Sequence, residues 1–249
     1  MKIKKNSPEV WDLVWKKDPT IDQEIIQIEK NKILFKRFEK ILIAKFGSIK
    51  GLKTIEIGAG TATYSLLLAS MGAKVTVLDY SPRAIKISKK LFKRYGYNAN
   101  FLEQDALKLN SSYFKRFDVS MSFGTAEHFS GKDRLKIIKT HFDLINNKGM
   151  VFIAVPNKWN APYLIHKKLS QSFKKWNFGE EYPFSPLEFI KIGNKIKRKF
   201  YFTGSTIFSD PFCTISRLKK LFNLKWRPFP EHGTFLDKYF ARYFVAYTK

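Results

Sequence analysis

The sequence predicts one α/β domain, in which a mainly parallel β-sheet carries helices on both faces. From Lys53 to Val155, short apolar segments alternate with longer segments whose apolar residues recur at helical spacing. Strands that alternate with helices are joined by right-handed crossovers, which build parallel sheets. The 249 residues are enough to bury a core, and the 44% apolar content argues against disorder.

The expected elements follow from apolar runs and their boundary residues. Strands are expected over residues 53–57, 74–78, 99–103, 117–122 and 150–155, and again near 199–208 and 242–248. Helices are expected over residues 62–71, 82–95 and 132–146, and after Ser185. Ser81 followed by Pro82 is a typical helix start, and Gly72 and Gly96 are typical helix ends.

An N-terminal helix is expected to precede the sheet. Thr20 and Gln23 have capping-box spacing, and Gly47 should end the helix soon after Lys45. Its apolar residues fall largely on one face: Ile25, Ile28, Phe35, Phe38 and Leu42. We therefore predict a helical cap segment over residues 1–50 and a main domain over 51–249, with residues 156–185 inserted as a substrate cover.

Composition excludes several classes of protein. The single cysteine, Cys213, rules out a disulfide framework or a zinc cluster and favours a reducing, cytoplasmic setting. No apolar run approaches the ~18 residues of a membrane-spanning helix, and no signal peptide follows the basic N-terminus, so a soluble protein is expected. The 46 basic and 21 acidic residues give a net charge of +25, which favours RNA or another polyanion as a partner. The lysines are spread along the chain, as on an ordinary solvated surface.

The strongest motif is a glycine turn between the first strand and the helix that follows it. Gly58 and Gly60 allow a tight turn and close approach of a ligand to the backbone. Ligands bind beyond the carboxyl ends of the strands in open α/β sheets. Asp79 ends the second strand, 19 residues after Gly60, where an acid typically meets the hydroxyl pair of a ribose. Asp105 supplies a third carboxylate at this edge.

The same motif disfavours a nicotinamide dinucleotide. The position of the third glycine in the dinucleotide fingerprint is Thr63. Glu56 would place a negative charge near the pyrophosphate, and suits instead a cationic nucleoside such as S-adenosylmethionine. A glycine turn without a ligand is the remaining alternative.

Glu56-Ile-Gly-Ala-Gly60 resembles the first motif of the class I S-adenosylmethionine-dependent methyltransferases, although Ala62 replaces a glycine common in that family. Asp79 is similar to the ribose-binding acid, and Gln104-Asp105-Ala106 resembles the segment that brackets the adenine. The resemblance implies a Rossmann-like fold with a seven-stranded sheet, and S-adenosylmethionine as cofactor with S-adenosylhomocysteine as product. The cofactor-binding residues it implies are Glu56, Gly58, Ala59, Gly60, Asp79, Tyr80, Asp105, Ala106, Ser122 and Phe123.

Residues 122–129, 147–157 and 176–185 resemble further segments of small-molecule methyltransferases, including those that act on quinone precursors. His128 is the candidate catalytic base because imidazole titrates near neutral pH. Glu127 would orient it or, as the resemblance to the quinone-precursor O-methyltransferases allows, help to ligate a metal. No resident metal is expected. His141 is expected to be structural. The residues expected to cover the substrate are aromatic: Trp11, Trp15, Trp176, Phe178 and Tyr182.

Three functions remain open at this stage. The first is a methyltransferase that acts on a small molecule by in-line displacement, and the second is an RNA methyltransferase that uses the basic surface. Against the second, Ser122-Phe-Gly-Thr125 stands where an amino-methylating Asn-Pro-Pro-Tyr-like tetrad would follow the fourth strand. The third is a non-catalytic binding protein with an anion patch on the helix 82–95. The sequence predicts neither the acceptor nor the oligomeric state.

Overall fold

The computed structural model describes residues 7–16, 23–173, 176, 179–207 and 233–248. Seven strands form one sheet in the order β3-β2-β1-β4-β5-β7-β6. They are β1 (Lys53–Ile57), β2 (Lys74–Asp79), β3 (Asn100–Glu103), β4 (Phe117–Phe123), β5 (Ile145–Pro156), β6 (Tyr201–Gly204) and β7 (Tyr243–Tyr247).

Strand direction confirms the predicted mainly parallel sheet. β1 to β5 pair in parallel, whereas β7 runs antiparallel to both β5 and β6. β1 lies between β2 and β4, so the chain order reverses on either side of it. Such a reversal opens a crevice at the carboxyl ends of the strands, and this is where the candidate site lies.

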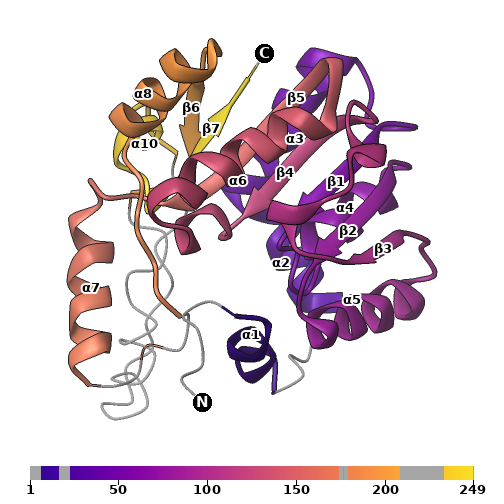
Figure 1. Ribbon diagram of the computed structural model, residues 1–249, viewed down its shortest axis with the longest axis horizontal. Coiled ribbons are helices and arrows are strands. Elements are labelled where there is room, and N and C mark those ends of the chain that lie inside the picture. Colours follow the sequence, from indigo (N-terminus) through magenta and orange to yellow (C-terminus); the bar gives the residue numbers. More distant parts are fainter. Residues whose placement is uncertain (1–6, 17–22, 174–175, 177–178, 208–232, 249) are drawn as a thin grey trace.

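Helices cover both faces of the sheet (Figure 1). Their bounds are α1 (Pro8–Val14), α2 (Gln23–Asn31), α3 (Ile33–Phe46), α4 (Thr63–Ser70), α5 (Pro82–Tyr95), α6 (Gly131–Leu144), α7 (Ala161–Ser172), α8 (Pro186–Ile196) and α10 (Asp237–Phe240). Short 3₁₀ turns are η1 (Ala106–Lys108), η2 (Ser111–Tyr113) and η3 (Ala126–His128). Among these helices, none combines the length and the apolar character needed to cross a membrane.

The two faces of the sheet build two apolar clusters. Alternate residues of β5 belong to opposite clusters: Phe152 packs with α3 and α4, and Ile153 packs with α6 and α8. Both are fully buried. Burial on both faces explains why this strand is continuously apolar in the sequence.

Helix α5 matches its predicted ends. Ser81 Oγ accepts a hydrogen bond from the backbone N–H of Ala84 at 3.1 Å, and Pro82 is the first helical residue. Gly96 closes the helix in the left-handed conformation, with φ of 72°. The residue types at these two ends are those that local helix-capping preferences predict.

The single N-terminal helix predicted from about Thr20 to Lys45 is wrong in one respect, because two helices are present. Lys32 has extended backbone angles (φ −61°, ψ 141°) and separates α2 from α3. As a result Ile28 is 51% exposed, whereas Phe38 lies in the core as predicted. No glycine or proline marks the break, so the sequence carries no local signal for it. Gly47 ends α3 as expected; Thr20 lies outside the described residues.

Candidate active site

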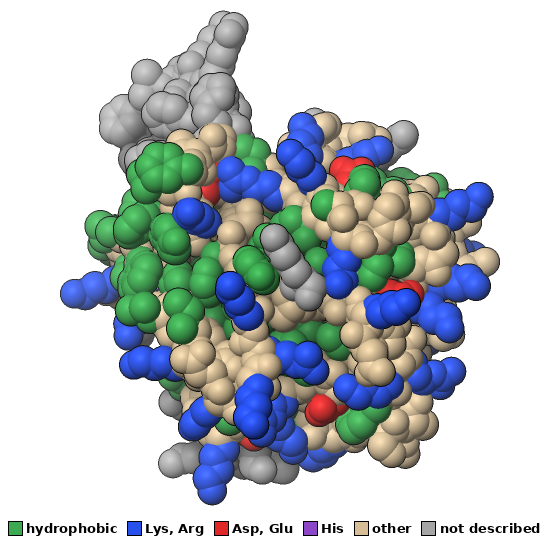
Figure 2. Space-filling view, turned by 90° about the horizontal axis from the view of Figure 1, so that it is seen from above, with side chains coloured by type: hydrophobic (Ala, Val, Ile, Leu, Met, Phe, Trp, Pro, Cys, Tyr) green, Lys and Arg blue, Asp and Glu red, His purple; other side chains and the backbone are tan. Residues whose placement is uncertain are grey.

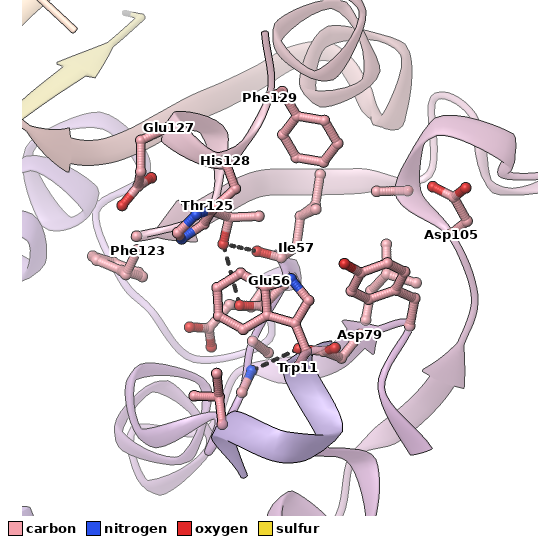
Figure 3. Close-up of a pocket in the computed structure, with 18 of the residues that line it drawn as sticks. Trp11, Glu56, Ile57, Asp79, Asp105, Phe123, Thr125, Glu127, His128 and Phe129 are labelled. Carbon is pink, nitrogen blue, oxygen red and sulfur yellow. Dashed lines mark hydrogen bonds between the residues drawn. The ribbon is translucent and has the colours of Figure 1, made fainter. Parts of the chain in front are cut away.

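A cavity of about 1220 Å³ opens at the carboxyl ends of β1, β2 and β4 (Figure 3). Its walls come from α1, from the loops after β1 to β4, and from residues 180–182. Pockets for one small ligand usually measure roughly 300–1,000 Å³. The cavity therefore has room for two small molecules side by side.

Gly58 and Gly60 line the cavity with bare backbone, and both have positive φ angles, of 61° and 54°. A Cβ on Gly58 would lie 2.5 Å from the Thr125 side chain, and one on Gly60 would lie 2.6 Å from the ring of Trp15. Thr125 donates from Oγ1 to the carbonyls of Ile57 and Gly58, at 3.1 and 3.2 Å. The loop after β4 thus holds the glycine turn in place, and no side chain could replace these glycines without displacing a neighbour.

Asp79 joins the loops that follow β1 and β2. Its Oδ2 accepts from the backbone N–H of Gly60, and its Oδ1 accepts from that of Ser81, both at 2.9 Å. Burial raises the pKa of this carboxyl above its usual range. Each oxygen keeps a second lone pair, so the predicted contact with a ribose is compatible with these bonds and stays a prediction.

Glu56 has a structural partner inside the protein. Its Oε2 accepts from both the backbone N–H and the hydroxyl of Ser65, at 3.1 and 2.6 Å. A carboxylate is favourable in the first turn of α4, where helix N–H groups lack partners. Burial raises the pKa of Glu56 to about 7. The side chain also lines the cavity, where the sequence predicts a cationic ligand.

The far wall of the cavity holds the predicted adenine segment. Asp105 accepts from the backbone N–H of Leu107 at 2.9 Å and lines the cavity beside Ala106. Phe123 lines the opposite part and stacks on Tyr64, with ring centroids 3.9 Å apart. Tyr80 and Ala59 also line the cavity, as predicted.

Ser122 was predicted to contact the cofactor, and this is wrong. Its hydroxyl lies 3.1 Å from Nε2 of His141, and the hydroxyl of Ser120 lies 2.8 Å from Nδ1. All three residues are fully buried, and burial lowers the pKa of His141 to about 3. Side chains alternate along a strand, so Phe123 lines the cavity while Ser122 and Ser120 point the other way. The expected structural role of His141 is confirmed.

Helix α1 forms part of the cavity wall, and Figure 3 shows its Trp11 projecting into the cavity. Its Asp12 accepts a short hydrogen bond from the hydroxyl of Ser81, at the N-terminus of α5. Trp11 meets His128 edge to face, with ring centroids 4.5 Å apart. Trp11 and Trp15 both line the cavity, as predicted for covering residues.

His128 is held by the main chain. Its Nδ1 donates to the carbonyl oxygen of Glu180 at 2.8 Å, which leaves the lone pair of the neutral ring on Nε2. Burial lowers the pKa of His128 to about 4, so the ring is neutral at physiological pH. The prediction that Glu127 orients this ring is wrong, because the Glu180 carbonyl has that role.

Glu127 is 2% exposed and lines the cavity. Its Oε2 is buried, and within the described part of the chain it has no hydrogen-bond partner. Burial raises the pKa of this carboxyl well above its usual range, and the charge of Glu181 adds to the rise. One possible ligand atom from each of Glu127, His128 and Glu181 lies within 4.8 Å of the others. The structure thus places Glu181 beside Glu127 and His128, for which the sequence showed no further neighbour.

Hydrogen bonds hold the main chain on both sides of Glu181 in place. Tyr182 N–H donates to the carbonyl of Glu127 at 2.7 Å, and Lys167 Nζ donates to the carbonyl of Glu181 at 2.6 Å. Arg134 donates to the carbonyl of Tyr182 at 2.8 Å. Residues 180–182 therefore form an anchored part of the cavity wall, and Tyr182 lines the cavity there.

Trp176 does not belong to this wall in the described structure. Its indole N–H donates to the carbonyl of Gly179 at 3.1 Å, and it is absent from the side chains that line the cavity. Its ring also lies near His166 and Lys167 of α7, and its predicted covering role stays a prediction. Phe178 lies outside the described residues.

Several lining residues were missed in the sequence: Thr125, Phe129, Glu180, Glu181 and Tyr243. Thr125 and Phe129 belong to the segment that resembles methyltransferases and could have been included on that ground. Glu181 and Tyr243 are far from the glycine turn in the chain. Only the fold brings them to it.

Comparison with known proteins identifies the family to which this domain is similar. Residues 48–204 match the family model described as a methyltransferase domain. The chain is 29% identical over 120 residues to a ubiquinone biosynthesis O-methyltransferase of Pseudoalteromonas translucida, covering 48% of this chain and 50% of the relative. It is 26% identical to a probable cobalt-precorrin-6B C(15)-methyltransferase of Pyrobaculum aerophilum, covering 53% and 78%. The chain spans about half the length of the curated ubiquinone relative.

Solved structures share the fold at lower identity. A magnesium protoporphyrin IX methyltransferase from Synechocystis PCC 6803 with bound S-adenosylhomocysteine has a TM-score of 0.58 and 18% identity, covering 80% of this chain and 89% of that one. An S-adenosylmethionine-dependent methyltransferase from Aquifex aeolicus has a TM-score of 0.55 and 14% identity, covering 98% of both. These likenesses concern the fold.

Proposed function

Because the chain belongs to the class I S-adenosylmethionine-dependent methyltransferase family, we propose that it transfers a methyl group to a small-molecule acceptor. The observation that carries this proposal is the bare glycine turn after β1, tied to Asp79 after β2, at the floor of a large cavity. The space beyond the cofactor end, lined by Glu127, His128 and Tyr182, is where we place the acceptor.

The residues present fit the cofactor of this family. Gly58 and Gly60 expose backbone to the cavity at positions where packing against Thr125 and Trp15 leaves no room for a Cβ, and Asp79 lines the same space from β2. Asp105 and Ala106 would bracket the base, and Glu56 offers a negative charge to a cation. When bound, S-adenosylmethionine supplies a methyl group that is already electrophilic, so the protein's tasks are to position the acceptor and exclude water.

The acceptor atom must lose a proton when it is a hydroxyl or an amine. We propose Glu127 as the proton acceptor, through its unpartnered Oε2, with His128 as its neighbour in the same wall. Burial raises the pKa of Glu127 and lowers that of His128, so the carboxylate is the stronger base. This reverses the roles that the sequence suggested for the two residues.

Charge at the acceptor end disfavours RNA as the acceptor. Glu127, Glu180 and Glu181 lie together in this part of the cavity, where a phosphodiester would meet like charge. On the face seen in Figure 2, Lys and Arg side chains are spread over the surface and do not form one stripe. The net charge of +25 is consistent with a general attraction for polyanions.

The function is tested by offering the protein methyl-labelled S-adenosylmethionine together with cell extract separated into a small-molecule fraction and an RNA fraction. We expect label in the small-molecule fraction. Asp79→Asn should abolish it, because the loops after β1 and β2 lose their shared carboxylate. Asp143→Asn, on the exposed face of α6, is the matched control and should transfer label normally.

Label confined to the RNA fraction would replace this proposal with its rival. Absence of label from both fractions, together with failure to bind S-adenosylhomocysteine, would contradict methyl transfer altogether.

A further inference from the structure

The acceptor end of the cavity contains a buried carboxyl group with one oxygen that has no hydrogen-bond partner among the described residues. Glu127 Oε2 is enclosed, yet it accepts no hydrogen bond from the described residues. An unpaired buried carboxylate is costly, and native proteins rarely keep one without a use. The oxygen also lines a cavity large enough for a second ligand. These facts indicate that a donor group is missing from the site.

The neighbouring charges do not supply this donor. Glu181, beside Glu127, has its own Oε2 occupied by the hydroxyl of Tyr163 at 2.6 Å. Lys167 directs its Nζ to the main-chain carbonyl of Glu181. Arg134 forms its ion pair with Glu188, outside the cavity. Two carboxyl groups therefore share one region of the cavity. The charges of Arg134 and Lys167 act on Glu127, and those of Lys167 and Arg242 act on Glu181, but none of them donates a hydrogen bond to Oε2 of Glu127.

Aromatic side chains line the same cavity as these carboxyl groups. The cavity lining includes Trp11, Phe129, Tyr182 and Tyr243. Aromatic faces attract organic cations through their quadrupoles, and carboxylates accept N–H donors in charge-assisted hydrogen bonds. Carboxylates combined with aromatic walls are the chemistry that recognises an alkylammonium group. A neutral hydroxyl would offer Glu127 a hydrogen bond without offsetting its charge.

We propose that the acceptor is a small amine whose ammonium group binds against the carboxylates of Glu127 and Glu181 and within these aromatic walls. This inference rests on the proposed methyl transfer. The bound ammonium gives one proton to Oε2 of Glu127, and the freed nitrogen lone pair forms the new N–CH₃ bond as the S–CH₃ bond breaks. The products are an N-methylammonium ion and a neutral thioether, and the proton held by Glu127 is released to water.

A divalent metal ion is the competing occupant, because Glu127, His128 and Glu181 have ligand atoms close together. The charge of Lys167 acts on both carboxyl groups. A divalent ion and an ammonium group would both be attracted by the two carboxylates and repelled by Lys167, so charge alone does not separate them. An ammonium group also uses the aromatic walls, which a metal ion does not need.

The test is a titration of the S-adenosylhomocysteine-bound protein with matched amines and alcohols: benzylamine and benzyl alcohol, 2-phenylethylamine and 2-phenylethanol, butylamine and butanol. We expect at least one amine to bind about tenfold more tightly than its alcohol. Glu127→Gln should remove this preference, and Glu181→Gln should weaken it. Glu103→Gln, an exposed acid outside the cavity, should leave it unchanged.

The inference is overturned if no amine is preferred, or if the preference survives in Glu127→Gln. It is also overturned if Mg²⁺, Mn²⁺ or Zn²⁺ alone binds, loses affinity in Glu127→Gln and competes with the amine. Binding of S-adenosylhomocysteine is measured first in the same samples, and reports on folding of each variant. Its failure in the wild-type protein would count against the proposed function, whereas its success without amine preference would count only against this inference.

Discussion

The two ends of the cavity differ in how their acidic groups are satisfied. At the cofactor end, Glu56 and Asp79 each accept two hydrogen bonds from neighbouring loops or helices. At the acceptor end, Oε2 of Glu127 has no partner among the described residues. The first end is complete as a scaffold before any ligand arrives. The second carries an unmet interaction, which is the signature of a group kept for chemistry.

The largest expected effect separates chemistry from cofactor binding. Glu127→Gln should lower turnover by about 10²–10⁴-fold, because the proton acceptor is lost. Affinity for S-adenosylhomocysteine should change less than about twofold, since the change lies at the other end of the cavity. Steady-state kinetics and calorimetry measure the two quantities. Unchanged turnover in the variant would remove Glu127 from the mechanism.

The raised pKa of Glu127 also predicts how the activity of the wild-type protein depends on pH. Activity should rise with pH as this carboxyl group becomes ionised.

The variant Gly60→Val tests whether cofactor binding requires a residue without a side chain at this position. The added side chain would enter the space of Trp15, and overpacking of this kind costs about 1–3 kcal/mol, which corresponds to a loss of affinity of up to about a hundredfold. Gly131→Val is the control, because Gly131 has a similar φ of 56° with open space around its Cβ position. Calorimetric titration with S-adenosylhomocysteine should show a loss of affinity in the first variant alone. Equal losses would assign the effect to backbone strain.

The raised pKa of Glu56 predicts that the free energy of unfolding falls as the pH rises. Burial raises its folded-state pKa to about 7, so between the unfolded value of about 4.5 and pH 7 the folded protein binds more protons than the unfolded chain. This contribution to the free energy of unfolding is full below pH 4.5 and is lost as pH rises to 7. Urea denaturation should show the wild-type protein losing a few kcal/mol over this window relative to Glu56→Gln. Parallel curves for the two proteins would contradict the assignment.

Ser81→Ala has the smallest expected effect and tests how α1 is held. The variant loses the cap of α5 and the contact with Asp12, and should be destabilised by about 1 kcal/mol. Ser185→Ala removes a comparable cap from α8 without a recorded contact to α1. Thermal unfolding should be similar in both variants. Only Ser81→Ala should weaken S-adenosylhomocysteine binding, and equal binding in the two would show that α1 does not depend on this contact.

The same contrast explains what the sequence could predict. The ends of α5 and the turn at Gly58 and Gly60 depend on neighbouring residues, so local patterns identify them. The break at Lys32 has no local signal. The meeting of Glu127 with Glu181 depends on contacts between residues far apart in the chain, such as the hydrogen bond from the main chain of Tyr182 to the main chain of Glu127. The acceptor end is formed by long-range packing. Patterns in a single sequence do not reveal such packing.

The cofactor assignment is tested most directly by calorimetric titration of the wild-type protein with S-adenosylhomocysteine, beside a titration with NAD. We predict saturable binding of one S-adenosylhomocysteine per chain and no binding of NAD. Saturable binding of NAD with no heat from S-adenosylhomocysteine would contradict the account.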